Sequence, residues 1–152
     1  MSEIAFIVGG IGSGKSLLSV IFTCKELDIS DRAVVTSVDL VDEAWPDWCH
    51  ENIKKAVDTN KRLRHLTQDE VRTFFLHQPG VSYDNMADVC ARRHGDRGCV
   101  YIIDETHLHF SARNWAMLTR KGNPSAEVEF YLSQCRHFND DVIFVTQHPE
   151  KV

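Results

Sequence analysis

Short apolar runs rich in β-branched residues recur along the chain and alternate with segments of helical periodicity. The runs are Ile4–Val8, Ala33–Val38, Cys99–Ile103 and Val142–Thr146. They are continuous rather than alternating, which predicts strands buried on both faces of a sheet. Between the first two runs, apolar residues follow a helical spacing from Ser16 to about Leu27. Strands that alternate with helices predict an α/β fold, with a mainly parallel sheet and helices on both faces.

The middle of the chain is more polar, and its pattern predicts helices. Asn52–Leu66 carries basic and apolar residues at helical intervals. Thr67 followed by Glu70 matches a capping box, which predicts a further helix that ends before Pro79. A last helix is expected from Pro124 in its first turn to about His137, followed by a turn.

Composition is that of an ordinary globular domain. The 152 residues suffice for one core, and no repeat or linker divides them, so a single domain over residues 1–152 is expected. The net charge of −5 argues against a dedicated nucleic-acid binder. The five cysteines form no CxxC pair, which favours a reducing compartment over a disulfide framework. There is no run of about 18 apolar residues, so no membrane span is predicted in this sequence.

A glycine-rich stretch separates the first predicted strand from the first predicted helix. Residues 9–16 read GGIGSGKS and match G-x-x-x-x-G-K-[ST], whereas the dinucleotide pattern G-x-G-x-x-G is not matched. Such a loop turns successive backbone N–H groups toward a phosphate, at the positive end of the following helix. The residues predicted to bind ATP are Gly9, Gly10, Ile11, Gly12, Ser13, Gly14, Lys15, Ser16 and Leu17.

Two acidic residues follow the third predicted strand. Asp104 and Glu105 come directly after Cys99–Ile103, at the carboxyl edge of the sheet where ligands bind. Asp104 and the Ser16 hydroxyl are predicted to hold Mg²⁺, and Lys15 is predicted to reach the β- and γ-phosphates. Glu105 is predicted to orient or deprotonate a water. This pair therefore favours ATP hydrolysis.

Further polar residues flank the last predicted strand. Gln147 is predicted to bind the γ-phosphate or the attacking water, with a plain polar strand end as the alternative. Arg136 is predicted to serve the γ-phosphate of a neighbouring subunit, and Arg113 is a second candidate. A surface arginine is the alternative for both. His107 and His109 follow the acidic pair, but without an evident third ligand they do not predict a metal site.

Two other functions fit a phosphate-binding loop. A small-molecule kinase would need a mobile basic lid, for which the segment 90–98 is the candidate, and it has less use for Glu105. A nucleotide-binding switch would bind nucleotide with negligible turnover, and Glu105 again argues against it.

Three segments together resemble the zonular occludens toxin (Zot) family, the filamentous-phage morphogenesis or gene I proteins. They are the phosphate loop near the N-terminus, the sequence IIDETH, and the sequence QCRHFNDDVIFVTQHP. The likeness is sharp over residues 4–18, 99–107 and 133–149.

The resemblance implies a P-loop NTPase with a three-layer α/β/α sandwich, similar in layout to the additional-strand, FtsK/HerA-like pumping ATPases. It implies an ATPase that powers assembly and export of filamentous phage from the cytoplasmic side of the bacterial inner membrane. A homo-oligomeric ring with a trans arginine is implied. So are phage assembly or DNA-packaging partners, and DNA contact through pore loops. This sequence would then be one piece of a membrane-anchored protein, whose toxin region, in some members, lies beyond the membrane span.

Overall fold

The fold is built on one sheet of five strands. The computed structural model describes residues 3–39, 51, 62–68, 71, 98–109, 132–133 and 135–148. The strands are β1 (Ile4–Val8), β2 (Ala33–Thr36), β3 (Leu63–His65), β4 (Cys99–Ile103) and β5 (Asp141–Thr146). The helices are α1 (Lys15–Ile29), the short α6 (Thr106–His109) and the 3₁₀ helix η2 (Cys135–Phe138).

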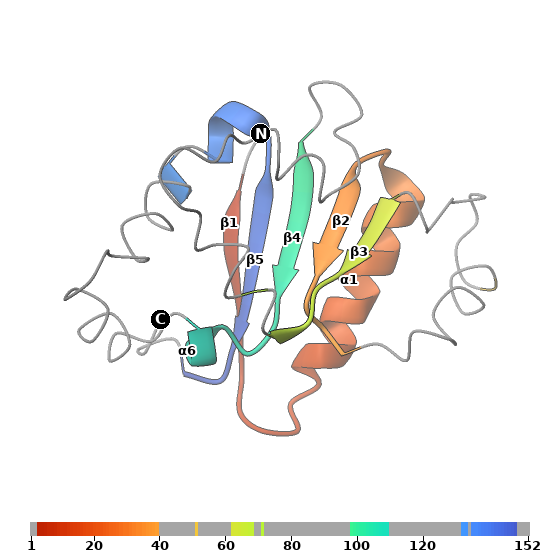
Figure 1. Cartoon of the computed structure of the whole chain (residues 1–152). Coiled ribbons are helices and arrows are strands. Elements are labelled where there is room, and N and C mark those ends of the chain that lie inside the picture. The colour runs from red at the N-terminus through yellow and green to blue at the C-terminus, as the bar shows by residue number, and fades with distance from the viewer. Residues whose placement is uncertain are drawn as a thin grey trace.

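The strand order places β5 between β1 and β4. The order across the sheet is β1-β5-β4-β2-β3, and every pair is parallel. In register, Val8 lies beside Thr146, and Ile103 lies beside Phe144. All strands therefore end at the same edge, where the β1–α1 loop and α6 also lie (Figure 1). This confirms the predicted parallel α/β fold, with an additional strand between β1 and β4.

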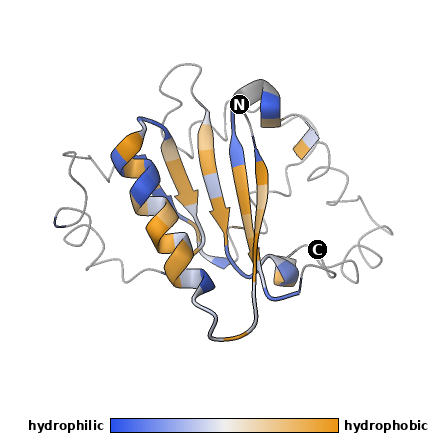
Figure 2. Cartoon of the chain, turned by 180° about the vertical axis from the view of Figure 1, so that it is seen from behind, coloured by the Kyte–Doolittle hydropathy of each residue, from blue (hydrophilic) through white to orange (hydrophobic). Residues whose placement is uncertain are grey.

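The core has two halves, one on each face of the sheet. On one face, Cys24 and Leu27 of α1 pack with Val34, Ile102 and Val145. On the other face, the helical residues Val71 and Leu132 pack with alternate strand residues, namely Val35, Tyr101, Ile103, Val142 and Phe144. Figure 2 shows the apolar strands behind α1. Because both halves contain helical residues, the prediction of helices on both faces is confirmed.

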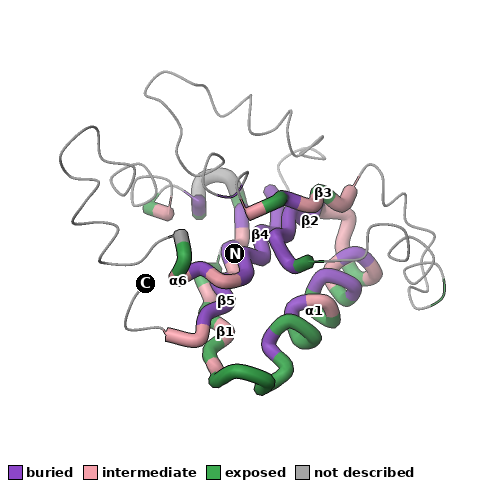
Figure 3. The backbone as a smooth tube through the Cα atoms, turned by 60° about the horizontal axis from the view of Figure 1, so that its bottom comes forward, coloured by how far each residue is buried: buried purple, intermediate pink, exposed green. Residues whose placement is uncertain are grey.

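The burial predicted for the first strand is wrong. Ile4, Phe6 and Val8 are 43%, 52% and 50% exposed, and Figure 3 shows how β1 differs from the buried β4 and β2. The reason is position, because β1 is an edge strand of the described sheet and only alternate side chains contact its core. Phe6 does contact Phe144, with ring centroids 5.5 Å apart. An apolar run alone does not distinguish an edge strand from a central one.

The prediction of a helix over Asn52–Leu66 is wrong for its last residues. Leu63–His65 forms β3, whose backbone pairs with Val34–Thr36 of β2. Sheet pairing here overrides the helical pattern of the local sequence. Residues 52–61 lie outside the described part, as do most of the helix predicted from Pro124 and the lid candidate 90–97. The Val71 N–H donates to the Thr67 carbonyl at 3.0 Å, which agrees with a helix beginning at the capping box.

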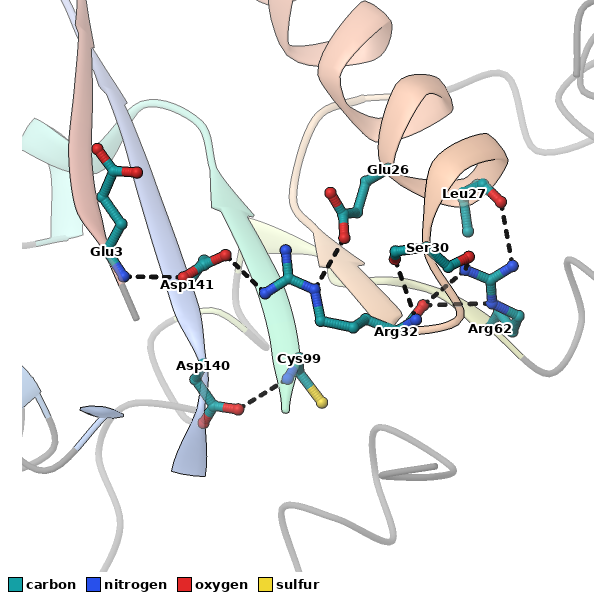
Figure 4. A network of polar contacts seen from close by, with 9 residues as sticks. All are labelled: Glu3, Glu26, Leu27, Ser30, Arg32, Arg62, Cys99, Asp140 and Asp141. Carbon is teal, nitrogen blue, oxygen red and sulfur yellow. Dashed lines mark hydrogen bonds and ion pairs between the residues drawn. The ribbon is translucent and has the colours of Figure 1, made fainter. Parts of the chain in front are cut away.

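Arg62 ties the end of α1 to the start of β2. Its guanidinium donates to the carbonyl oxygens of Leu27 at 3.1 Å, Ser30 at 2.7 Å and Arg32 at 2.9 Å (Figure 4). Burial lowers the pKa of Arg62. Carbonyl oxygens at a helix C-terminus have no partner within the helix, so this side chain satisfies groups that the fold leaves open.

Arg32 joins α1 to the first residue of β5. Its Nε donates to Glu26 at 2.8 Å and its Nη1 donates to Asp141 at 2.6 Å. Asp141 also accepts the Glu3 N–H at 2.8 Å, which adds β1 to the network. Burial lowers the pKa of Arg32, but the two hydrogen bonds to carboxylates outweigh it and the net shift is upward. This network fixes the amino edge of the sheet (Figure 4).

Replacing Arg62 is expected to destabilise the fold. Arg62→Ala leaves three partly buried carbonyl groups without this donor, which should cost about 1–3 kcal/mol. For a chain of this size that lowers Tm by roughly 2–4 °C per kcal/mol. Thermal unfolding measures the change, with Arg64→Ala as the control because Arg64 is an exposed arginine of β3. Equal melting temperatures of the two variants would contradict the role given to Arg62.

Candidate functional site

The loop after β1 opens directly onto the first turn of α1. Gly14 is the N-cap of α1, with φ at 82°, a left-handed conformation that favours glycine. No side chain caps this helix end, and no acidic residue lies in its first turn. The amide groups of the first turn are therefore open to an anionic ligand, at the positive end of the helix.

Gly9 lies close to the side chain of Ser13. A Cβ atom at this position would lie 2.5 Å from Ser13 Oγ and 3.2 Å from Ser13 Cβ. At Gly10, in contrast, a Cβ would meet nothing within 4 Å. A side chain at the first glycine of the motif would therefore displace Ser13, whereas one at Gly10 would not.

Lys15 bends back over the loop. Its Nζ donates to the carbonyl oxygens of Gly9 and Gly10, both at 2.8 Å, and the residue is 9% exposed. Because an ammonium group has three donors, one remains for a further acceptor. The side chain is thus held inside the loop, where it places a positive charge at the centre of the site.

The loop meets the end of β4 through two oxygen-bearing side chains. Ser16 Oγ donates to Asp104 Oδ2 at 3.1 Å, although the two residues are 88 positions apart. Asp104 is 8% exposed, and its backbone N–H donates to Ser37 Oγ at 2.9 Å. Hydroxyl and carboxylate oxygens suit Mg²⁺, which takes few protein ligands and completes its shell with phosphate and water. The described residues hold no cluster of three His, Cys, Asp or Glu side chains that suits another metal.

Glu105 and Gln147 come together across β4 and β5. Gln147 Nε2 donates to Glu105 Oε1 at 3.2 Å. The backbone of Glu105 is left-handed, with φ at 51°, and its N–H donates to Asp104 Oδ1 at 2.8 Å. A left-handed conformation is uncommon for glutamate. The Glu105 carboxylate accepts from Gln147, whereas the Asp104 carboxylate accepts from Ser16. The two neighbouring acids therefore have different surroundings, as different roles require.

Arg136 is not brought to this cluster. It is exposed and lies in η2, directly before β5, whereas the phosphate loop follows the end of β1. Figure 1 shows η2 near the start of β5 and the loop at the other end of the strands. Within one chain, Arg136 is therefore too far away to reach the loop, and its predicted role requires a second subunit. Arg113 and the side chain of His109 lie outside the described residues.

Two residues near the site had no assigned role from the sequence. Ser37 supports the backbone of Asp104 from the end of β2, and His107 lies with Nδ1 3.4 Å from Glu105 Oε2. A serine after a strand carries no sequence signal of its own. From the sequence, His107 is considered only as a metal ligand. Its nearness to Glu105 depends on the position of α6.

Gly9 and Gly10 provide a matched pair of substitutions. Gly9→Ala is expected to distort the loop because its Cβ would overlap Ser13, and to raise the Kd for ATP by about tenfold or more, roughly 1.4 kcal/mol. Gly10→Ala should leave the fold of the loop and its melting temperature unchanged. Titration with a fluorescent ATP analogue and thermal unfolding test this pair. If the two variants have the same Kd for ATP and the same melting temperature, the close approach at Gly9 is not needed.

Three solved structures illustrate which proteins share this fold. The N-terminal domain of zonular occludens toxin from Neisseria meningitidis is 20% identical, with a TM-score of 0.53 over 100% of this chain and 70% of that one. The genome packaging NTPase B204 from Sulfolobus turreted icosahedral virus 2, in complex with ATP-gammaS, is 19% identical. Its TM-score is 0.58 over 99% and 67% of the two chains. B204, the DNA-packaging ATPase from Sulfolobus turreted icosahedral virus, is 21% identical, with a TM-score of 0.55 over 95% and 65%.

Comparison of the sequence with family models decides the family. A comparison with curated proteins gave no match. None of the described helices is both long enough and apolar enough to cross a membrane. The model of the family described as zonular occludens toxin (Zot) matches residues 3–152, which include the loop, both acidic residues and Gln147. This chain therefore belongs to the Zot family, as the resemblance of its motifs predicted.

Proposed function

We propose that this chain is a Mg²⁺-dependent, ATP-hydrolysing motor domain of a Zot-like inner-membrane protein that powers filamentous phage assembly and export. The contact between Ser16 and Asp104 carries the proposal, because it joins the phosphate loop to the carboxylate that would share its metal ion. ATP is the favoured nucleotide because one neighbour is described in complex with ATP-gammaS.

The first step in the proposed reaction is binding. The open amides at the start of α1 bind the phosphates. The Lys15 ammonium group exchanges its two loop carbonyl partners for phosphate oxygens. Ser16 and Asp104 would hold the Mg²⁺, and the ion would neutralise charge that develops on the transferred phosphoryl group. Gly9 through Leu17 supply the rest of the binding loop.

The second step is attack by water. Glu105 accepts a proton from the water, and Gln147, which already touches this carboxylate, orients the water toward the γ-phosphate. The phosphorus–oxygen bond to the β-phosphate breaks, and the products are ADP and inorganic phosphate. Lys15 stabilises the negative charge on the leaving group.

The motor role is proposed from the neighbours and the place of Arg136. Two neighbours are described as viral packaging enzymes, which suggests that hydrolysis here is coupled to movement of a substrate such as phage DNA. In a homo-oligomeric ring, the exposed Arg136 of one subunit would face the γ-phosphate of the next. The proposed setting is the cytoplasmic side of the inner membrane, with phage assembly components as partners and DNA contacted by pore loops.

Turnover separates this proposal from its two alternatives. A kinase would consume ATP only with an acceptor, and a switch would bind ATP without consuming it. Glu105 favours hydrolysis over both because neither alternative needs the carboxylate that Gln147 contacts.

Replacing the proposed base should abolish turnover while sparing binding. Glu105→Gln is expected to lower kcat by about 10²-fold or more, because the amide accepts no proton, and to leave the Kd for ATP within about twofold. Phosphate release with Mg²⁺, compared with release in EDTA, measures this.

The control for this variant is Glu3→Gln, which removes the same charge directly before β1, at the amino end of the strands and away from the site. This control should turn over ATP at the wild-type rate. Tight binding without hydrolysis in the wild-type chain would favour the switch, and hydrolysis only with an added acceptor would favour the kinase.

The trans role of Arg136 predicts complementation between variants. Specific activity of the wild-type chain should rise with protein concentration, and Arg136→Ala should lose about 10³-fold in kcat. Mixing Arg136→Ala with Glu105→Gln should restore turnover above the sum of the two. At a mixed interface, the Arg136→Ala subunit supplies an intact Glu105, and the Glu105→Gln subunit supplies an intact Arg136. If the mixture is no more active than its parts, Arg136 does not act across an interface.

A further inference from the structure

Glu105 is approached from a second side by a histidine. His107 Nδ1 lies 3.4 Å from Glu105 Oε2, while Gln147 Nε2 lies 3.2 Å from Oε1 of the same carboxylate. Gln147 belongs to the turn after β5, and His107 belongs to α6. The two carboxylate oxygens thus have separate neighbours from separate elements.

The Nδ1 atom of His107 is buried, and no hydrogen bond satisfies it. The 3.4 Å separation from Oε2 is within ion-pair range, but its geometry is not that of a hydrogen bond. A buried polar atom without a partner destabilises the fold, because it has lost its hydrogen bonds to water. The unsatisfied nitrogen therefore lies beside Oε2 of the proposed base.

His148 restricts the ring of His107. Their ring centroids are 5.7 Å apart, and the planes meet at 80°, an edge-to-face arrangement. The His148 N–H in turn donates to Thr146 Oγ1 at 3.1 Å, which fixes the turn after β5. One turn therefore holds Glu105 twice: directly through Gln147, and indirectly through His148 and His107.

The backbone of Glu105 makes such support necessary. Its left-handed conformation is unfavourable for a residue that carries a Cβ. Its carbonyl accepts the Leu108 N–H at 2.8 Å, so the turn that strains Glu105 also begins α6. The main chain is thus fixed on both sides of Glu105, and the direction of the carboxylate depends on side-chain contacts.

We propose that His107 is a positioning residue for Glu105: its Nδ1 holds Oε2 while Gln147 holds Oε1, so that the carboxylate faces the attacking water. The inference rests on the proposed hydrolytic role of Glu105. His107 touches neither nucleotide nor metal in this scheme, and acts only through the glutamate.

Three substitutions in the full chain test this inference. His107→Ala is expected to lower kcat for ATP by about tenfold or more, because a misdirected base loses its alignment with the water, while the Kd for ATP stays within about twofold. His107→Asn should recover most of the rate, because its amide nitrogen replaces Nδ1. Leu108→Ala is the matched control, since Leu108 lies next in α6 and is 52% exposed, and it should turn over ATP normally.

A double variant separates positioning from a general structural effect. If His107 acts through Glu105, His107→Ala should cause no further loss in a chain that already carries Glu105→Gln. An equal loss in both backgrounds, or His107→Asn as slow as His107→Ala at an unchanged melting temperature, would overturn the inference.

The failures of the two proposals are distinguishable. If Glu105→Gln is inactive but His107→Ala keeps the wild-type kcat, only the inference is wrong. If the wild-type chain has no turnover, or Glu105→Gln keeps it, the hydrolytic role of Glu105 and the inference are both overturned.

Discussion

The contact between the Ser16 hydroxyl and the Asp104 carboxylate is the interaction on which the site depends. The strands that lead to these residues, β1 and β4, are not neighbours, because β5 lies between them. Their ends are therefore about 10 Å apart, twice the spacing of adjacent strands. The gap is closed because α1 leaves the loop across the sheet and packs over β2 and β4, which carries Ser16 toward Asp104. The position of α1 thus sets the geometry of the proposed metal site.

The C-terminal end of α1 is also bound to the sheet, through two arginines. Arg62 binds the last carbonyls of the helix, and Arg32 connects Glu26 of α1 to Asp141 of β5. The helix is thereby joined to the sheet at both ends: by a hydroxyl–carboxylate contact in the site and by guanidinium groups at the amino edge. A change at the amino edge that shifts α1 would reach the site through the helix, because a helix transmits displacement along its axis without bending much.

The motifs could be predicted from the sequence because they depend on residue spacing and on the fact that ligands bind at the carboxyl ends of parallel strands. Gly9–Ser16 is recognisable by spacing alone, and Asp104 follows an apolar strand whose end must lie at the ligand edge. What could not be predicted depends on contacts distant in sequence. Leu63–His65 becomes a strand only because β2 offers it an open edge, and the exposure of Phe6 depends on β1 being outermost. His107 approaches Glu105 where the backbone of Glu105 is left-handed, and no pattern of residue types predicts that conformation.

The pairing of Gln147 with Glu105 suggests how binding and chemistry are connected. A glutamine amide has two N–H donors and a carbonyl acceptor, and one donor is used by the carboxylate. The remaining donor and the carbonyl can meet a phosphate oxygen and a water at the same time. A nucleotide that draws the amide toward its γ-phosphate must therefore pull on Glu105 as well. The other oxygen of this carboxylate lies 3.4 Å from His107 Nδ1, and the backbone of Glu105 is left-handed. If Glu105 is the base, as proposed, a movement of Gln147 would change the direction of its carboxylate, and the turn after β5 would then connect nucleotide state to hydrolysis.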